Sequence, residues 1–203
     1  EYLTSKGVLP SIAHTSAVYD DVVKGYEVGY RHVTHFYNAM GGFHNVREYK
    51  QEGTVESVYL IDGMTVEVIA DGIHVPIPLL KLVYKIKGVE GTALCTDGLS
   101  CSAGDENMYL DPRFIIENGV CKLADRSALA GSVATMDRLI RTMVNEAGVT
   151  LFDAVRMSSE TPARIMGVFD RKGSIKAGKD ADMCIYDADL NLKGVIAYGK
   201  KVV

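Results

Sequence analysis

Short apolar runs alternate with amphipathic stretches along most of the chain. Four runs rich in β-branched or aromatic residues are bounded by glycine or polar residues and predict strands, at positions 8–14, 30–35, 65–70 and 92–96. The stretches between them have apolar residues at helical spacing, as from about 17 to 28 and from Pro76 to Gly88. Strands that alternate with helices predict an α/β protein with a parallel sheet.

The pattern after position 98 is more varied. The Asn118-Gly119 pair between two short apolar runs predicts a β-hairpin over 114–123. A strongly amphipathic helix is expected around Met136–Val144, and Thr150 with Asp153 marks the start of another. The polar stretch 41–53 is longer than an ordinary connection, so it predicts either a functional loop or a mobile surface excursion.

The last segment changes character, because glycine turns separate short strands from Gly173 onward and the amphipathic stripes disappear. We expect two domains, 1–168 with the alternating units and 169–203 with strands of a small β unit. The alternative for the second is a C-terminal hairpin packed on the main body.

Each of the four predicted strands ends in polar residues: His14, His35, Asp71 with His74, and Asp97. In a barrel of alternating strands and helices, the carboxyl ends of all strands meet at one active-site face. A doubly wound open sheet would also gather its site there, usually with a glycine-rich phosphate loop, and no G-x-G-x-x-G follows a strand here. We therefore predict a TIM-type (β/α)8 barrel, of which four units are about half.

Composition narrows the class of protein. With 203 residues, 47% of them hydrophobic, and a net charge of -4, the chain can bury a core and is a poor candidate for binding nucleic acid. No apolar run reaches the roughly 18–20 residues of a membrane helix. The four cysteines lie far apart, as is typical of reduced thiols in a cytoplasmic protein. Because the chain starts at Glu1 without a methionine, we expect a C-terminal part of a longer protein.

The polar strand ends predict metal chemistry. Two imidazoles, His14 and His35, suit a catalytic zinc or iron site, which takes about three protein ligands and a water. Asp97 is a candidate to take a proton from that water and pass it to a departing amine, although an Asx turn at Asp97-Gly98 is the structural alternative. If Asp97 were instead the third ligand no obvious base would remain, so a carboxylate upstream of Glu1 is the expected third ligand.

Several segments, taken together and in order, resemble N-acetylglucosamine-6-phosphate deacetylases of the amidohydrolase superfamily. The similarity covers nearly the whole chain, and the most specific element is Thr34–Met40. The segments are 14–17, 34–40, 70–75, 96–98, 129–132 and 172–182. The resemblance implies the second half of the barrel with C-terminal strands of a small β-sandwich domain.

The resemblance also implies roles for individual residues. It implies hydrolysis of an acetamido group with one divalent metal per site, held by His14 and His35, and with Asp97 activating water. Residues implied to contact the amino sugar phosphate are Asn38, Ala39, Arg47, Asp71, Gly72, Ile73, His74, Leu129, Ala130 and Gly131. The implied assembly is a homodimer. For Arg47 an exposed surface position is the alternative, and His32 and His44 match no implied role.

The family's glutamate ligand and a further substrate-orienting histidine match nothing in this chain, so we predict little or no deacetylase activity from these 203 residues alone. Two other classes of function stay open. One is another amidohydrolase activity, on a cyclic amide or a nucleobase. The other is a half-barrel that only binds a sugar phosphate or associates with itself.

Overall fold

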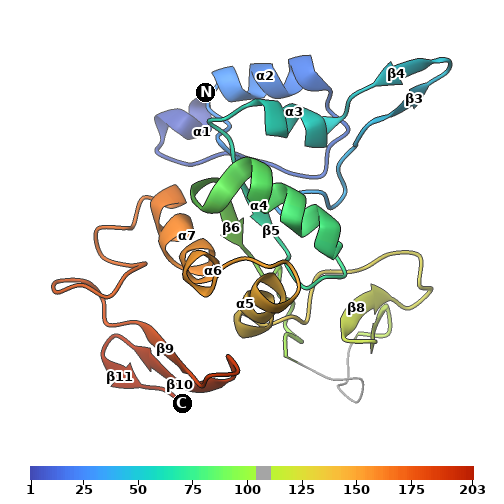
Figure 1. Cartoon of the computed structure of the whole chain (residues 1–203). Helices are drawn as coiled ribbons and strands as arrows, with labels where there is room; N and C mark the ends of the chain where they lie inside the picture. The colour runs from blue at the N-terminus through green and yellow to red at the C-terminus, as the bar shows by residue number, and fades with distance from the viewer. Residues whose placement is uncertain (104–110) are drawn as a thin grey trace.

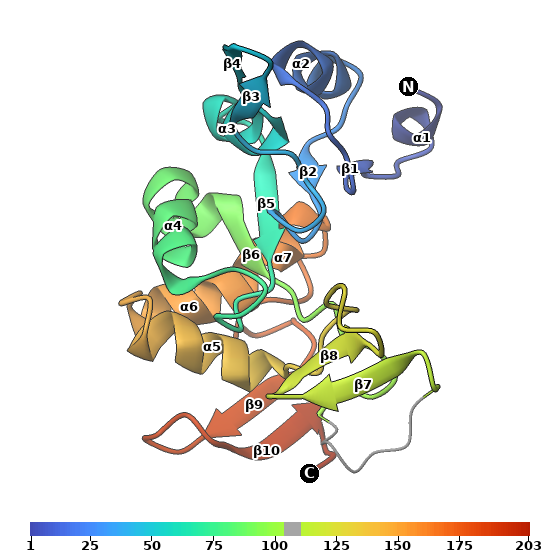
Figure 2. The same ribbon diagram turned by 90° about the vertical axis from the view of Figure 1, so that its right-hand side faces the viewer.

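A four-stranded parallel sheet organises the computed structural model, which describes residues 1–103 and 111–203 (Figure 1). Its strands are β1 (Ser11–Ile12), β2 (His32–Val33), β5 (Thr65–Val68) and β6 (Thr92–Leu94), paired in the order β1-β2-β5-β6 (Figure 2). The four predicted strands are confirmed, but they are shorter than expected. Pro10 has no N–H to donate before β1, and His14 and His35 turn the backbone into the left-handed region just after β1 and β2.

Helices connect and cover the strands. Helix α4 packs on β5 and β6, and α6 packs on α4 and α5, so that α4, α5 and α6 lie on the same side of the sheet (Figure 2). The helices are α1 (Tyr2–Ser5), α2 (Tyr19–Glu27), α3 (Thr54–Leu60), α4 (Ile77–Gly91), α5 (Met136–Asn145), α6 (Leu151–Ser158) and α7 (Glu160–Ile165). Helix α4 runs past Gly88, the residue predicted to end it, although Gly88 breaks the helical conformation with φ 65°. Helix α3 was not predicted; it begins where the Gly53 N–H donates to Glu56 Oε2 at 2.9 Å.

The sheet has one apolar and one polar face. Val33, Val66 and Val68 are fully buried toward the helices, together with Leu80 and Leu139. The residues that alternate with these valines form the polar face of the sheet. It consists of Ser11, His32, Thr34, Thr65 and Glu67, and hydrogen bonds of 2.6 Å (Ser11 to Thr34) and 2.8 Å (His32 to Thr65) cross it. Because successive side chains of a strand point to opposite faces, the core residues and the polar residues lie on opposite faces of the sheet.

A helix cap offers a simple test of this fold. Thr150 Oγ1 accepts a hydrogen bond from the Asp153 N–H at 3.1 Å, which confirms the predicted start of α6. We expect Thr150→Ala to lower the free energy of unfolding by about 1 kcal/mol, because one N–H at the helix start loses its acceptor. Urea unfolding measures this change. Thr150→Ser keeps the hydroxyl and should stay within a few tenths of a kcal/mol of the unmodified chain; an equal loss in both variants would contradict the cap.

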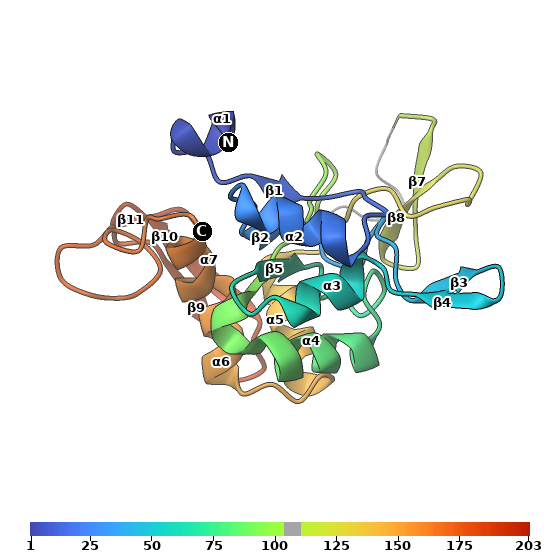
Figure 3. The same cartoon turned by 90° about the horizontal axis from the view of Figure 1, so that it is seen from above.

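Two hairpins extend from the body of the chain. The first, β7 (Phe114–Glu117) with β8 (Val120–Leu123), turns at Asn118 and Gly119, both at positive φ, as the Asn-Gly pair predicted. The second corrects a prediction: residues 41–53 are not an irregular loop but contain β3 (His44–Val46) and β4 (Tyr49–Gln51). Figure 3 shows this hairpin reaching away from the sheet. The residues of this hairpin are almost all exposed and polar, so the sequence has no apolar alternation that would predict the two strands.

The C-terminal segment forms a separate three-stranded antiparallel sheet. Its strands are β9 (Met183–Tyr186), β10 (Leu192–Ala197) and β11 (Lys200–Lys201), in the order β11-β10-β9. Arg141 on α5 joins it to the main body, because Nη1 donates to the Leu190 carbonyl at 2.9 Å while also pairing with Asp137 at 2.7 Å. None of the helices in the described ranges has the length and apolar character needed to cross a membrane.

Candidate active site

Three residues predicted to carry the chemistry share an unusual backbone conformation. His14, His35 and Asp97 follow β1, β2 and β6, and their φ angles are 43°, 34° and 47°. Residues other than glycine rarely occupy this left-handed region, and such strain concentrates at functional sites. At each of these positions the chain leaves its strand abruptly, which keeps the side chain at the carboxyl edge of the sheet.

His14 and His35 meet at that edge. Their Nε2 atoms are 3.0 Å apart and the ring centroids 4.8 Å apart, with His35 only 8% exposed. Two nitrogens bound to one tetrahedral zinc at about 2.0–2.1 Å lie roughly 3.3 Å from each other, so the pair fits a shared metal ion with little movement. The structure therefore brings the two rings together with their Nε2 atoms facing each other.

Among the residues that the structure describes, no third ligand accompanies the pair. Within residues 1–103 and 111–203, no group of three or more histidine, cysteine, aspartate or glutamate side chains is placed to hold a metal ion. His35 Nδ1 is buried without a hydrogen-bond partner in the same part of the chain. The arrangement is thus a two-nitrogen site.

Asp97 lies at the end of β6, which β5 separates from β2, and Cys95 lies close to the main chain of both His35 and Asp97. Burial and the charges of Glu67 and Asp97 raise the pKa of the Cys95 thiol, and main-chain hydrogen bonds from His35 and Asp97 offset this only in part. The Asp97 side chain itself is exposed. Within the described residues, its carboxylate makes no hydrogen bond or ion pair with either imidazole.

The segment 129–131 lies beside Asp97. The Ser132 N–H donates to the Asp97 carbonyl at 3.0 Å, and the Ala130 N–H donates to the Cys121 carbonyl at 3.1 Å. Gly131 adopts φ 60° with the Leu99 side chain against it, where a Cβ would lie 2.7 Å from Leu99 Cγ, so only glycine fits here. The structure thus brings the predicted contacts Leu129, Ala130 and Gly131 to the strand end that carries Asp97.

Asp71 and His74 form a buried pair after β5. The Asp71 carboxylate accepts from the N–H groups of Ile73 (2.9 Å) and His74 (2.8 Å), and its other oxygen contacts His74 Nδ1 at 2.7 Å. Burial raises the pKa of Asp71, but these hydrogen bonds and the His74 charge outweigh it, and the net pKa is lowered. His74 Nε2 is buried without a partner among the described atoms. Asp71 is therefore occupied in orienting His74, whereas His74 has a ring nitrogen left for a ligand.

The turn after His35 contains the next two predicted contacts. Positive φ angles at His35, Tyr37 (79°) and Ala39 (51°) alternate with other conformations, and the turn is held by the Phe36 N–H, which donates to the Glu67 carbonyl at 2.7 Å, and by the Asn38 N–H, which donates to the His35 carbonyl at 3.0 Å. Asn38 closes the turn with its side-chain amide, which donates to the His35 carbonyl at 3.2 Å. Asn38 and Ala39 thus lie directly beside the histidine pair.

Arg47 is not brought to this cluster. It occupies the exposed turn between β3 and β4 at φ 56°, on the hairpin that reaches away from the sheet. Arg47 makes no ion pair with any other described residue.

The sequence interpretation missed three residues on the floor of the site. They are His32, Glu67 and Cys95. His32 matches no role that the resemblance implies, yet its ring contacts Thr65 Oγ1 and Glu67 Oε2. A signal was present: in Thr65–Val68, alternation with Val66 and Val68 places Glu67 on the polar face, pointing away from the helices.

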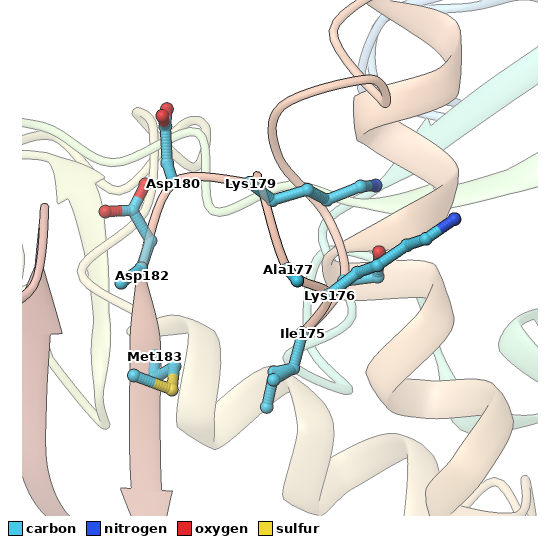
Figure 4. A pocket seen from close by; sticks show the side chains of 9 residues that line it. Ile175, Lys176, Ala177, Lys179, Asp180, Asp182 and Met183 are labelled. Atoms are coloured by element: carbon cyan, nitrogen blue, oxygen red, sulfur yellow. The ribbon is translucent and has the colours of Figure 1, made fainter.

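A surface pocket lies elsewhere, in the C-terminal part of the chain. It has a volume of about 350 Å³ and is lined by residues of 174–183, including Ile175, Lys179 and Asp182 (Figure 4). None of the predicted site residues lines it. It belongs to the connection between α7 and β9 and has no part in the histidine site.

Known proteins identify the family of this arrangement. The model of the amidohydrolase family matches residues 5–202. The N-acetylglucosamine-6-phosphate deacetylase of Bacillus subtilis is 32% identical over 98% of this chain and 49% of its own length. The chain thus spans about half the length of the curated relatives it matches.

Solved structures agree. The N-acetylglucosamine-6-phosphate deacetylase from Pasteurella multocida is 28% identical, with a TM-score of 0.88 over 98% of this chain and 52% of that one. A variant of the Mycobacterium smegmatis deacetylase in complex with N-acetyl-D-glucosamine 6-phosphate is 29% identical, with a TM-score of 0.87 over 99% of this chain and 53% of that one. The parallel sheet, the convergent histidines and the match over nearly all its residues show that the chain belongs to the amidohydrolase family.

Proposed function

We propose that this chain carries the metal-binding and substrate-binding half of a deacetylase that hydrolyses N-acetylglucosamine 6-phosphate to glucosamine 6-phosphate and acetate. The observation that carries the proposal is the 3.0 Å approach of His14 Nε2 and His35 Nε2 at the carboxyl edge of the sheet. The relatives named above, which bear this activity in their names, support it.

The site residues divide the work. His14 and His35 would hold a divalent zinc or iron ion, which when bound polarises a carbonyl oxygen and lowers the pKa of water. Asp97 takes the proton from water and returns it to the leaving amine. His74, oriented by Asp71, offers Nε2 to the sugar phosphate, and Asn38 and Ala39 contact its phosphate.

The remaining predicted contacts have supporting roles. Gly72 and Ile73 belong to the turn that Asp71 closes, and Leu129, Ala130 and Gly131 border the site on the Asp97 side. Arg47 lies in the exposed turn of its hairpin and is not brought to the histidine pair within one chain. We propose that it reaches phosphate only in a homodimer, where an arginine fork suits the ligand.

The architecture follows the same proposal. Residues 1–168 form the second half of a (β/α)8 barrel, and 169–203 supply strands to a small β-sandwich domain. The four parallel strands and the separate antiparallel sheet β11-β10-β9 support this division. The third metal ligand is expected from outside these 203 residues.

Ligand binding tests the proposal without requiring turnover. The chain loaded with zinc is titrated with N-acetylglucosamine 6-phosphate, with N-acetylglucosamine and with a cyclic amide such as dihydrouracil, by calorimetry. We expect the phosphorylated sugar to bind at least about tenfold more tightly than the other two, because its phosphate gains charge-assisted hydrogen bonds. Tighter binding of the cyclic amide would favour the alternative amidohydrolase activity.

The same samples test for catalysis. We expect little or no release of acetate, since one ligand and one substrate-orienting histidine are expected from elsewhere. Robust turnover by the zinc- or iron-loaded chain would contradict the assignment of the third ligand to a region outside these residues.

A further inference from the structure

One ring nitrogen of His35, Nδ1, has no hydrogen-bond partner among the described atoms. If its Nε2 lone pair faces a metal ion, or accepts a hydrogen bond from His14, the ring proton sits on Nδ1. Nδ1 is buried and has no partner among the described atoms. A buried donor without an acceptor is costly, and histidines that bind metals almost always donate their second nitrogen to a carboxylate, a carbonyl or water.

Glu67 is the carboxylate that approaches this residue. Its Oε1 lies 3.4 Å from the His35 main-chain nitrogen, and its own carbonyl accepts from the Phe36 N–H at 2.7 Å. The Glu67 side chain projects from β5 on the polar face of the sheet, and because β5 pairs with β2 it reaches the turn that follows β2 at His35. Glu67 therefore already holds the backbone on both sides of the His35 carbonyl.

The other carboxylate contact of Glu67 is a weak one. Thr65 Oγ1 donates to the Arg31 carbonyl at 3.2 Å, so it must accept from His32 Nδ1 at 2.8 Å, which leaves His32 Nε2 to face Glu67. The separation between His32 Nε2 and Glu67 Oε2 is 3.5 Å, near the outer limit for a hydrogen bond. Both carboxylate contacts of Glu67 are long, so the group can turn at small cost.

Glu67 is largely shielded from water, because its side chain is only 26% exposed. A carboxylate can only accept hydrogen bonds, so a ring N–H is a suitable partner for it.

We infer that Glu67 is a positioning residue for His35: its carboxylate accepts the Nδ1–H of His35 and so directs the Nε2 lone pair at the metal. This rests on the proposed metal site of His14 and His35. Glu67 does not touch substrate or metal. It fixes the tautomer and the ring orientation, a role that the resemblance assigned to no residue of this chain.

Two measurements test the inference. The first is metal-free ¹⁵N NMR of the histidine side chains, in which we expect His35 to carry its proton on Nδ1 in the unmodified chain and to shift toward Nε2 in Glu67→Gln. The second is cobalt affinity by competition with a chelator, in which we expect Glu67→Gln to bind about 10- to 100-fold more weakly. Glu27→Gln, an exposed carboxylate on α2, is the matched control and should change neither.

The outcomes separate this inference from the proposed function. If the unmodified chain binds no cobalt, the metal site fails, whereas the NMR tautomer still decides the role of Glu67. If Glu67→Gln does not fold, the tautomer in the unmodified chain decides alone. A proton on His35 Nε2 in that chain, or equal cobalt affinity in folded Glu67→Gln, overturns the inference.

Discussion

Replacing His14 and His35 together with alanine is expected to abolish zinc and cobalt binding by the chain. Their Nε2 atoms converge to 3.0 Å, so both donors are lost at once. Four-ligand zinc sites gain about 10–16 kcal/mol, or roughly 3 kcal/mol per ligand, which predicts a loss of about 100-fold in affinity for each histidine removed. Calorimetric titration with zinc measures the single and double variants.

His44→Ala is the matched control for this experiment. His44 is an exposed histidine on β3, and its Nδ1 contacts the Gly42 carbonyl at 2.8 Å. The His44→Ala variant should bind zinc with the same affinity as the unmodified chain. A double variant that still binds zinc with unchanged affinity and stoichiometry would place the metal elsewhere.

Asp71→Ala is expected to destabilise the fold by about 3–5 kcal/mol, the range for breaking a buried charged pair. The Asp71 side chain is fully buried, and its loss leaves the N–H groups of Ile73 and His74 and the His74 ring nitrogen without their acceptor. Urea unfolding measures the difference. Asp170→Ala, at an exposed aspartate, is the control and should change stability by less than about 0.5 kcal/mol.

The same carboxylate predicts a pH dependence. The folded-state pKa of Asp71 is lowered from 3.8, so its stabilising effect is present above that value and is lost as the pH falls through the lower folded pKa. Between about pH 5 and pH 2, the unmodified chain should therefore lose stability more steeply than Asp71→Ala. Parallel slopes for the two proteins would show that Asp71 is not stabilised as a carboxylate in the folded state.

The positions of the strands could be predicted from sequence because apolar alternation records which face is buried. Val33, Val66 and Val68 face the helices as the pattern requires, and His14 and His35 follow their strands at one edge. The strand lengths could not be predicted in the same way. Their ends depend on left-handed turns at residues other than glycine, and composition gives no sign of these.

Roles within the site were predictable to different degrees. Asp71 carries the expected residue type in the expected place, but only the hydrogen bonds show that it serves His74 rather than a ligand. Arg47 was a candidate because the resemblance implied a phosphate contact there, whereas β3 and β4 extend it away from the sheet. Glu67 lies inside β5, whereas the predicted site consists of residues at and after the strand ends.

X-ray absorption by the zinc-loaded chain tests the central claim most directly. The account predicts two imidazole nitrogens at about 2.0–2.1 Å from the zinc, with water oxygens completing the shell, and loss of both imidazoles in the double alanine variant. A spectrum with sulfur ligands, or with an imidazole count that is the same in the double variant, would contradict a metal site built from His14 and His35.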